Sequence, residues 1–235
     1  MSLILSDEVP LASLWKKFAG EDKAYLNYRV HQEVGKSDLL VQISEIQIEI
    51  QSIQKKFQLE FQNLSWIKLF AKAPGNNPTE WTESRHCLLK VLQELSSSKE
   101  PPFVSLSHTD SRSIAISLQP THDNILGVGV DIEKSDRSVS SGASEKFALE
   151  SEKNLGLTAL EIWVIKESCF KASSKMEGTF VTRYEIEDYD SFRREGHAKL
   201  ITDPNISIRF MIREVEGYLI SFAISSIGAY AEPAK

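Results

Sequence analysis

The sequence predicts an α+β fold, because patterns typical of strands and of helices occur in separate blocks along the chain. Apolar residues alternate with a period of two in residues 39–62, which predicts half-buried antiparallel strands. A helical pattern follows from residue 78, then three strand-like segments, a helical stretch at 143–175 and two further strands. Glu100, Pro101 and Pro102 form a natural break, so we expect two halves, residues 1–100 and 101–235.

The first long helix has a recognisable start. Asn77 and Glu80 have the spacing of a capping box, and Pro78 suits the first helical position. We expect the buried stripe of this helix to comprise Trp81, Leu88, Leu92 and Leu95.

The later elements are predicted from residue composition and periodicity. Residues 103–108, 113–118 and 126–133 have the apolar, β-branched character of strands. Residues 143–175 are expected to form two helices, and residues 206–215 and 217–226 to return to strands.

Composition and charge argue against several classes of protein. Lys and Arg number 27 and Asp and Glu 33, so the net charge of −6 disfavours a nucleic-acid binder. An anionic ligand would need a local group of cations or a metal. No apolar run is long enough to span a membrane, and no basic leader of a signal peptide precedes the first apolar residues. Cys87 and Cys169 lack metal-type spacing, so we expect free thiols in a reducing cytoplasm.

One candidate metal-binding pair lies at the end of the strand predicted at 126–133. In an extended chain Asp131 and Glu133 project from the same face. Two adjacent carboxylates repel each other unless a positive group joins them, and Mg²⁺ typically takes one or two carboxylates together with phosphates and water. The alternative is that both acids merely begin a solvated loop.

Two further segments carry residues that could take part in chemistry. The helix at 163–171 is expected to bury Ile162, Ile165 and Cys169, and to present on its other side Trp163, Lys166, Glu167, Phe170 and Lys171. The alternative is an ordinary Glu167–Lys171 surface pair beside partly buried aromatic residues. At another strand end, Ser107 and His108 could donate hydrogen bonds to a phosphate, although a lone histidine is more often an ordinary surface residue.

Taken together and in this order, the three segments resemble a known family. Ser-His at 107–108, Gly-Val-Asp-Ile-Glu at 129–133 and Trp-x-x-Lys-Glu-x-x-x-Lys at 163–171 are similar to motifs of the phosphopantetheinyl transferase superfamily, in its larger, pseudo-dimeric branch. Phe147, Glu152 and the strand at 217–223 fit the same pattern, and the resemblance covers residues 78–228. Thr109 stands where the family has serine, and a single glycine follows Lys171 where the family has a Gly-x-Gly-like turn.

The resemblance implies two similar α+β halves, each an antiparallel sheet packed with a long helix, with coenzyme A bound between them. It implies Mg²⁺-dependent transfer of phosphopantetheine from coenzyme A to a serine of an apo acyl or peptidyl carrier protein, which releases 3′,5′-ADP. By motif, Asp131, Glu133 and Glu167 would bind the metal. Glu167, or a water that it positions, would accept the serine proton, and Lys171 would contact the pyrophosphate.

The resemblance also implies where the remaining phosphate would be held. His108 with Ser107 would bind the 3′-phosphate of coenzyme A, with Arg85 as the first choice for a further cation and with Lys68 and Lys72 as weaker choices. Lys166 would bind phosphate or simply pair with an acid. Because one chain with two halves could complete its own site, we expect a monomer. Since carrier proteins are usually acidic, we also expect a local basic or apolar docking patch.

Three alternatives stay open. A non-catalytic homologue that binds coenzyme A or a carrier protein would be expected to lack at least one of the metal ligands. A metal-dependent phosphohydrolase would normally need a richer set of His and Asp ligands than five scattered histidines supply. A plain interaction module would use Trp163 and Phe170 as contact residues.

Overall fold

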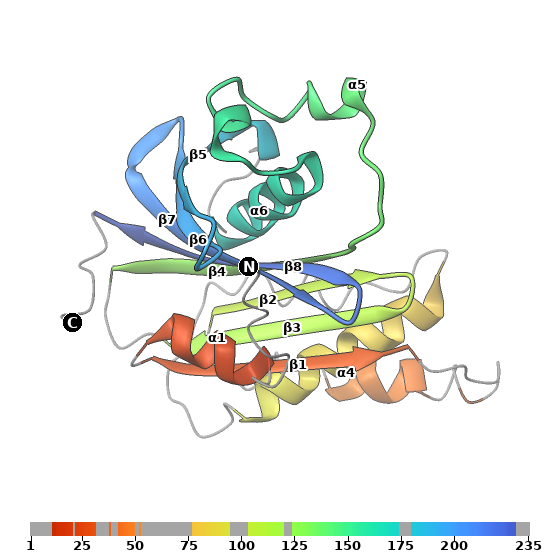
Figure 1. The fold of residues 1–235 in the computed structure, drawn as a ribbon. Coiled ribbons are helices and arrows are strands. Elements are labelled where there is room, and N and C mark those ends of the chain that lie inside the picture. The colour runs from red at the N-terminus through yellow and green to blue at the C-terminus, as the bar shows by residue number, and fades with distance from the viewer. Residues whose placement is uncertain are drawn as a thin grey trace.

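A computed structural model describes residues 11–20, 22–31, 38, 42–49, 52, 77–94, 103–119, 124–173 and 180–228. Within these residues helices pack on two antiparallel sheets, so the predicted α+β fold is confirmed (Figure 1). None of the described helices is long and apolar enough to cross a membrane.

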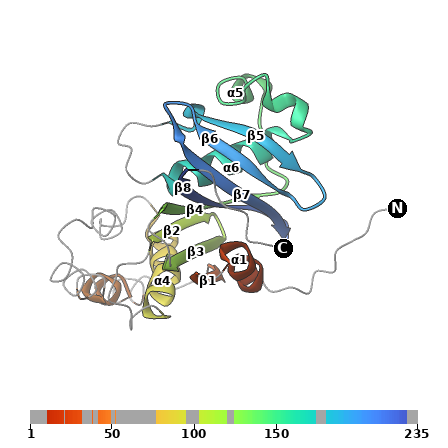
Figure 2. The same ribbon diagram turned by 90° about the vertical axis from the view of Figure 1, so that its left-hand side faces the viewer.

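The smaller sheet has three strands in the order β1-β3-β2. Its strands are β1 (Lys23–Val30), β2 (Phe103–Thr109) and β3 (Arg112–Gln119). Its two helices are α1 (Leu11–Ala19) and α4 (Pro78–Glu94). Side chains alternate along β3, so Ala115 packs with Leu88 and Leu92 of α4, whereas Ile114 and Ile116 face the opposite side with α1. The two helices therefore cover opposite faces of this sheet (Figure 2).

The larger sheet has five strands in the order β4-β8-β7-β6-β5. Its strands are β4 (Ile125–Lys134), β5 (Tyr184–Asp190), β6 (Glu195–Leu200), β7 (Asp203–Val215) and β8 (Tyr218–Ile227). Its helical segments are α5 (Ser141–Ser144), η1 (Glu152–Leu155), α6 (Ala159–Ala172) and η2 (Val181–Arg183). Helix α6 covers one face of this sheet, where Ile165 and Cys169 pack with Phe210 and Ala223.

The two sheets share one hydrophobic cluster on their inner faces. Val128, Val130 and Ile132 of β4 pack there with Ile114 and Ile116 of β3. The other face of β4 meets α6 so closely that a Cβ on Gly129 would lie 1.8 Å from the backbone oxygen of Ser168. Strand β4 is therefore buried on both sides, and its odd-numbered residues, which include Asp131 and Glu133, point toward α6.

The division between the sheets differs from the predicted division of the chain. Strand β1 pairs with β3, so the three-stranded sheet combines segments from both sides of residue 100. The sheets separate between β3 and β4, and they are unequal in strand number. Each sheet does have one long helix on one face, α4 for the smaller and α6 for the larger.

Helix α4 matches its prediction closely. It begins at Pro78, and the backbone N–H of Glu80 donates to the side chain of Asn77 over 3.1 Å. Trp81, Leu88 and Leu92 are buried as expected, whereas Leu95 lies outside the described residues.

Two predictions from periodicity were wrong. Residues 42–49 are helical, not extended, and they bury Ile46 while leaving Ile48 largely exposed. Among the described residues of the stretch at 143–175, α6 is the single long helix, and short helical turns and loops occupy residues 145–158.

Candidate functional site

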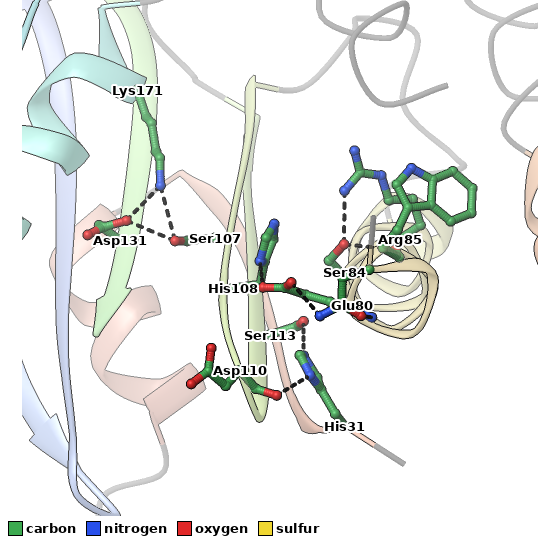
Figure 3. Close-up of polar contacts among 12 residues, drawn as sticks. His31, Glu80, Ser84, Arg85, Ser107, His108, Asp110, Ser113, Asp131 and Lys171 are labelled. Carbon is green, nitrogen blue, oxygen red and sulfur yellow. Dashed lines mark hydrogen bonds and ion pairs between the residues drawn. The ribbon is translucent and has the colours of Figure 1, made fainter. Parts of the chain in front are cut away.

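Three side chains from three separate elements meet where β2, β4 and the end of α6 come together. Lys171 Nζ lies 2.7 Å from Asp131 Oδ1 and 3.1 Å from Ser107 Oγ. The hydroxyl of Ser107 donates to the same oxygen of Asp131 over 2.8 Å. Figure 3 shows the three side chains turned toward one another. Together with Glu133 and Glu167 they form what we call the acidic site.

Local structure explains why these side chains converge. Asp131 and Glu133 share the α6 face of β4, and Gly129 lets the last turns of α6 approach that strand. Glu167 and Lys171 are one helical turn apart, so both lie over the end of the strand. Helix α6 is fixed at its start by a capping box between Thr158 and Glu161, which holds its register. The fold thus brings Ser107, Asp131 and Lys171, which are distant in sequence, into contact.

The acidic site carries more negative charge than its own cation neutralises. Burial, and then the Asp131 carboxylate, raise the pKa of the Glu167 carboxyl, while Lys171 lowers it and Glu133 raises it further. Glu133 also accepts a hydrogen bond from Arg137, four residues along the chain. Among the described residues, Asp131 Oδ2 is buried and has no hydrogen-bond partner. One carboxylate oxygen is therefore unsatisfied beside two other acids.

These residues have the donor chemistry of a Mg²⁺ site but are not arranged as one. The site offers the oxygen ligands that a hard divalent cation prefers. Such a cation would also pair with the buried carboxylate oxygen that lacks a partner and reduce the repulsion between the acids. However, within the described ranges, no three His, Cys, Asp or Glu side chains are grouped closely enough to hold an ion. Lys171 instead donates a hydrogen bond to Asp131 Oδ1. The donor set fits the metal, and its grouping around an ion stays a prediction.

The contact of Lys171 with Ser107 could suggest a Ser–Lys nucleophile, but the hydrogen bonds argue against one. The Ser107 hydroxyl donates a hydrogen bond to Asp131 and accepts one from the Lys171 ammonium, so the lysine is not placed to remove the hydroxyl proton. Ser107 is also buried. Its role is to tie β2 to the acid of β4.

Lys166 lies away from the acidic site, in the protein interior. Its ammonium is 2.8 Å from a carboxylate oxygen of Glu152, with both side chains 0% exposed, and it donates to the backbone oxygen of Phe147 over 2.7 Å. Burial lowers the pKa of this ammonium, although the Glu152 carboxylate opposes the effect. The expectation that Lys166 shares an outward face of α6 with Lys171 was wrong. The sequence left two roles for Lys166, binding phosphate or pairing with an acid, and its contact with Glu152 matches the second.

His108 lies on the opposite side of β2 from Ser107. Alternate strand residues point to opposite faces, so Ser107 faces β4 while His108 faces α4, where its Nδ1 contacts Glu80 Oε1 (Figure 3). The two residues expected to hold one phosphate are thus directed apart.

Arg85 lies with His108, on the α4 side of β2 (Figure 3). Its guanidinium donates to Ser84 Oγ over 2.9 Å and lies over the ring of Trp81. Burial lowers the pKa of Arg85 to about 10. Lys68 and Lys72 lie outside the described residues.

A cavity of about 540 Å³ lies between residues 137–147 and Trp163 of α6. Arg137, which binds Glu133, and Trp163, one turn before Glu167, both line it. Val139 and Phe147 add apolar surface, and Lys146 adds a second cation. The cavity therefore combines basic and apolar groups, and Arg137 links it to Glu133 of the acidic site.

Sequence reasoning missed two acids that the structure makes important. Glu80 was identified only as a helix cap, and its contact with His108 depends on the packing of α4 against β2. Glu152 was noted as part of the family pattern, but nothing in its neighbourhood indicated that Lys166 would be its partner. Both contacts join segments that lie far apart along the chain, so no local signal could have predicted them.

Comparisons with known proteins add no independent assignment. No protein-family model matches the chain, and no curated protein matches it.

Proposed function

We propose that this protein is a Mg²⁺-dependent phosphopantetheinyl transferase. It transfers the 4′-phosphopantetheine group of coenzyme A to a serine of an apo acyl or peptidyl carrier protein. The observation that carries the proposal is the convergence of Asp131, Glu167 and Lys171 in one site, with a buried carboxylate oxygen that lacks a partner among the described residues.

The reaction assigns a role to each of these side chains. The carrier serine oxygen attacks the β-phosphorus of coenzyme A, and the bond from that phosphorus to the bridging oxygen breaks, so that 3′,5′-ADP leaves. Glu167 accepts the proton of the serine hydroxyl. Lys171 provides positive charge for the leaving phosphate.

The metal would be held by Asp131 and Glu167, with Glu133 as the third acid. When bound, Mg²⁺ neutralises charge on the pyrophosphate and on the oxygens of the transferring group. Ser107 and Lys171 hold Asp131 in place through its Oδ1, which leaves Oδ2 as the available ligand atom. Glu133 is shared with Arg137, so its contribution would depend on loosening that ion pair.

The cavity lined by Arg137, Lys146 and Phe147 is the surface that we assign to the carrier protein and the pantetheine arm. We assign it this role because Arg137 and Lys146 are basic and Val139 and Phe147 are apolar, on a protein of net charge −6. An acidic carrier would be attracted by the two cations, while the apolar wall suits an uncharged arm.

One observation favours a second candidate, a non-catalytic homologue that binds coenzyme A or a carrier protein. Lys171 forms an ion pair with Asp131, and if this pair persisted, Asp131 could not bind a metal. The chain does retain every acid of the motif, together with Lys171, which is why we place the enzyme first.

The test follows the mass of several apo carrier proteins incubated with this protein, coenzyme A and Mg²⁺. The enzyme predicts a phosphopantetheine adduct on at least one carrier, at least about 100-fold slower with Asp131→Ala or Glu167→Gln. Glu150→Gln is the matched control, because it removes one exposed carboxylate of the same half and leaves the site intact.

The other outcomes identify the alternatives. Binding of coenzyme A without an adduct on any carrier would refute the enzyme and favour the non-catalytic homologue. Release of phosphate from coenzyme A alone would favour a phosphohydrolase.

A further inference from the structure

The acids of the acidic site already have cations of their own. In the described part of the chain, Lys171 Nζ lies 2.7 Å from Asp131 Oδ1, and Arg137 pairs with Glu133. Glu167 adds a third carboxylate to the same site. A divalent ion that enters the site therefore meets two positive side chains as well as three acids.

Lys171 lies next to the atom that a metal would need. Asp131 is 6% exposed, and among the described residues its Oδ2 is buried without a hydrogen-bond partner. Because the two oxygens of a carboxylate share one carbon, an ion on Oδ2 would lie close to the ammonium on Oδ1. Like charges at short range repel, and the repulsion is stronger where water is largely excluded. Lys171 therefore opposes a metal at Asp131 even though it leaves Oδ2 free.

Lys171 is able to change partners without disrupting the fold. Its side chain is 26% exposed, whereas that of Lys166 is 0% exposed, so the Lys171 ammonium can reach solvent. If it leaves, Asp131 Oδ1 still accepts the 2.8 Å hydrogen bond from Ser107, which Figure 3 shows beside the lysine. The contact of Lys171 with Asp131 is therefore replaceable, unlike the fully buried pair of Lys166 with Glu152.

A ligand with adjacent phosphates would supply the new partner. Phosphate oxygens form strong charge-assisted hydrogen bonds with lysine and arginine, so they would attract Lys171 away from Asp131 and Arg137 away from Glu133. Each cation that moves to the ligand releases a carboxylate for the metal. Mg²⁺ itself also takes phosphate oxygens as ligands. The anion and the metal should therefore strengthen each other's binding.

From this geometry we infer that Lys171 is the resident counter-ion of Asp131, and that it keeps Mg²⁺ weakly bound until a diphosphate ligand draws the ammonium away. Metal and donor then bind cooperatively, and the protein holds little Mg²⁺ when no donor is present. The inference deepens the proposed function and rests on it for the identity of the metal and of the donor, coenzyme A. No covalent bond changes, since only the partner of the ammonium differs between the two states.

The experiment measures the dissociation constant of Mg²⁺ by calorimetry, with and without saturating coenzyme A, at one fixed pH. The proteins compared are wild type and Lys171→Met, which keeps an unbranched side chain and removes the charge. Lys171→Gln is a second neutral variant that keeps a hydrogen-bond donor for Asp131, in case the methionine variant does not fold. Lys153→Met is the matched control, because Lys153 is 53% exposed and pairs with Glu150 away from the acidic site.

Without coenzyme A, we expect the neutral variants of Lys171 to bind Mg²⁺ at least about tenfold more tightly than wild-type protein does. Coenzyme A should tighten Mg²⁺ binding at least about tenfold in wild-type protein and in Lys153→Met, and by a smaller factor in the Lys171 variants. Mg²⁺ binding without coenzyme A that is no tighter in the neutral Lys171 variants than in wild-type protein would overturn the inference.

The carrier mass assay, run on the same wild-type protein, separates this inference from the proposed function. If no carrier is modified but the Lys171 variants bind Mg²⁺ more tightly without coenzyme A, the transferase assignment fails and the role of Lys171 stands. If a carrier is modified but wild-type protein binds Mg²⁺ equally well with and without coenzyme A, the transferase assignment stands and the role of Lys171 fails. If Mg²⁺ binds none of these proteins under either condition, both fail.

Discussion

Helix α6 carries two lysine–acid ion pairs that have almost the same N···O distance but differ in burial and in hydrogen bonding. Lys166 and Glu152 lie 2.8 Å apart and are both 0% exposed, whereas Lys171 and Asp131 lie 2.7 Å apart, with the lysine 26% exposed. Glu152 also accepts backbone hydrogen bonds from Leu149 and Ile186, at 2.7 and 2.8 Å. Asp131 keeps one buried oxygen without a partner among the described residues.

This difference distinguishes a structural pair from a reactive one. The buried pair has a partner for both carboxylate oxygens and ties α6 to η1 and β5, which is what a buried charge needs in order to be tolerated. The Lys171–Asp131 pair is only partly exposed, and Glu167 and Glu133 add negative charge beside it that Lys171 alone does not neutralise. Chemistry at α6 is therefore expected at its C-terminal end, and the Lys166 pair is expected to support the fold.

The largest effect should come from breaking the buried pair. Glu152→Ala leaves the Lys166 ammonium uncompensated in the interior, so the free energy of unfolding should fall by about 3–5 kcal/mol. Urea unfolding would measure this loss.

The double variant Glu152→Gln with Lys166→Met tests the reason for that loss. It removes both charges together, and much of the stability should return, because no unpaired charge stays buried. A double variant as unstable as Glu152→Ala would show that lost packing, not the unpaired charge, explains the effect.

A smaller effect of opposite sign is expected at the acidic site. The raised pKa of Glu167 means that the folded state holds its proton more tightly than the unfolded state does. The ionised carboxylate therefore costs stability, and this cost appears as pH rises from the ordinary glutamate range through the higher folded pKa. Glu167→Gln should be more stable than wild-type protein at pH 7, and the gain should vanish below about pH 4.

Thermal unfolding across pH would measure the gain of Glu167→Gln. Glu150→Gln should show no comparable gain, because Glu150 is 84% exposed and pairs with Lys153. A Glu167→Gln protein that is less stable than wild type at pH 7 would contradict the view that repulsion dominates this site.

The sequence predicted those parts of the fold that depend on local chemistry. Asn77, Pro78 and Glu80 marked the start of α4 correctly, and the alternation in 126–133 placed Asp131 and Glu133 on one face. The segment at 42–49 misled because spaced isoleucines suit a half-buried helix as well as a strand, and only tertiary contacts decide between them.

The motifs singled out residues of the acidic site but did not predict how they pair. Ser107 was expected to bind a phosphate together with His108, whereas its hydroxyl contacts Asp131 and Lys171. Periodicity alone placed Lys166 on an outward face of α6. This was wrong because the segment that carries Phe147 and Glu152 folds back over that side of the helix and buries the lysine. Strand alternation directs His108 away from Ser107, which the expectation of a shared phosphate site did not take into account, and its partner Glu80 depends on how α4 packs.

The most direct test of the acidic site is the effect of Mg²⁺ on thermal unfolding, with coenzyme A at a fixed saturating concentration. Mg²⁺ at about 100 times its dissociation constant should raise the Tm of wild-type protein and of Glu150→Gln by roughly 5–10 °C. Asp131→Asn, compared with its own baseline, should show almost no rise. An equal rise in Asp131→Asn, or none in wild-type protein, would contradict a metal site at these acids.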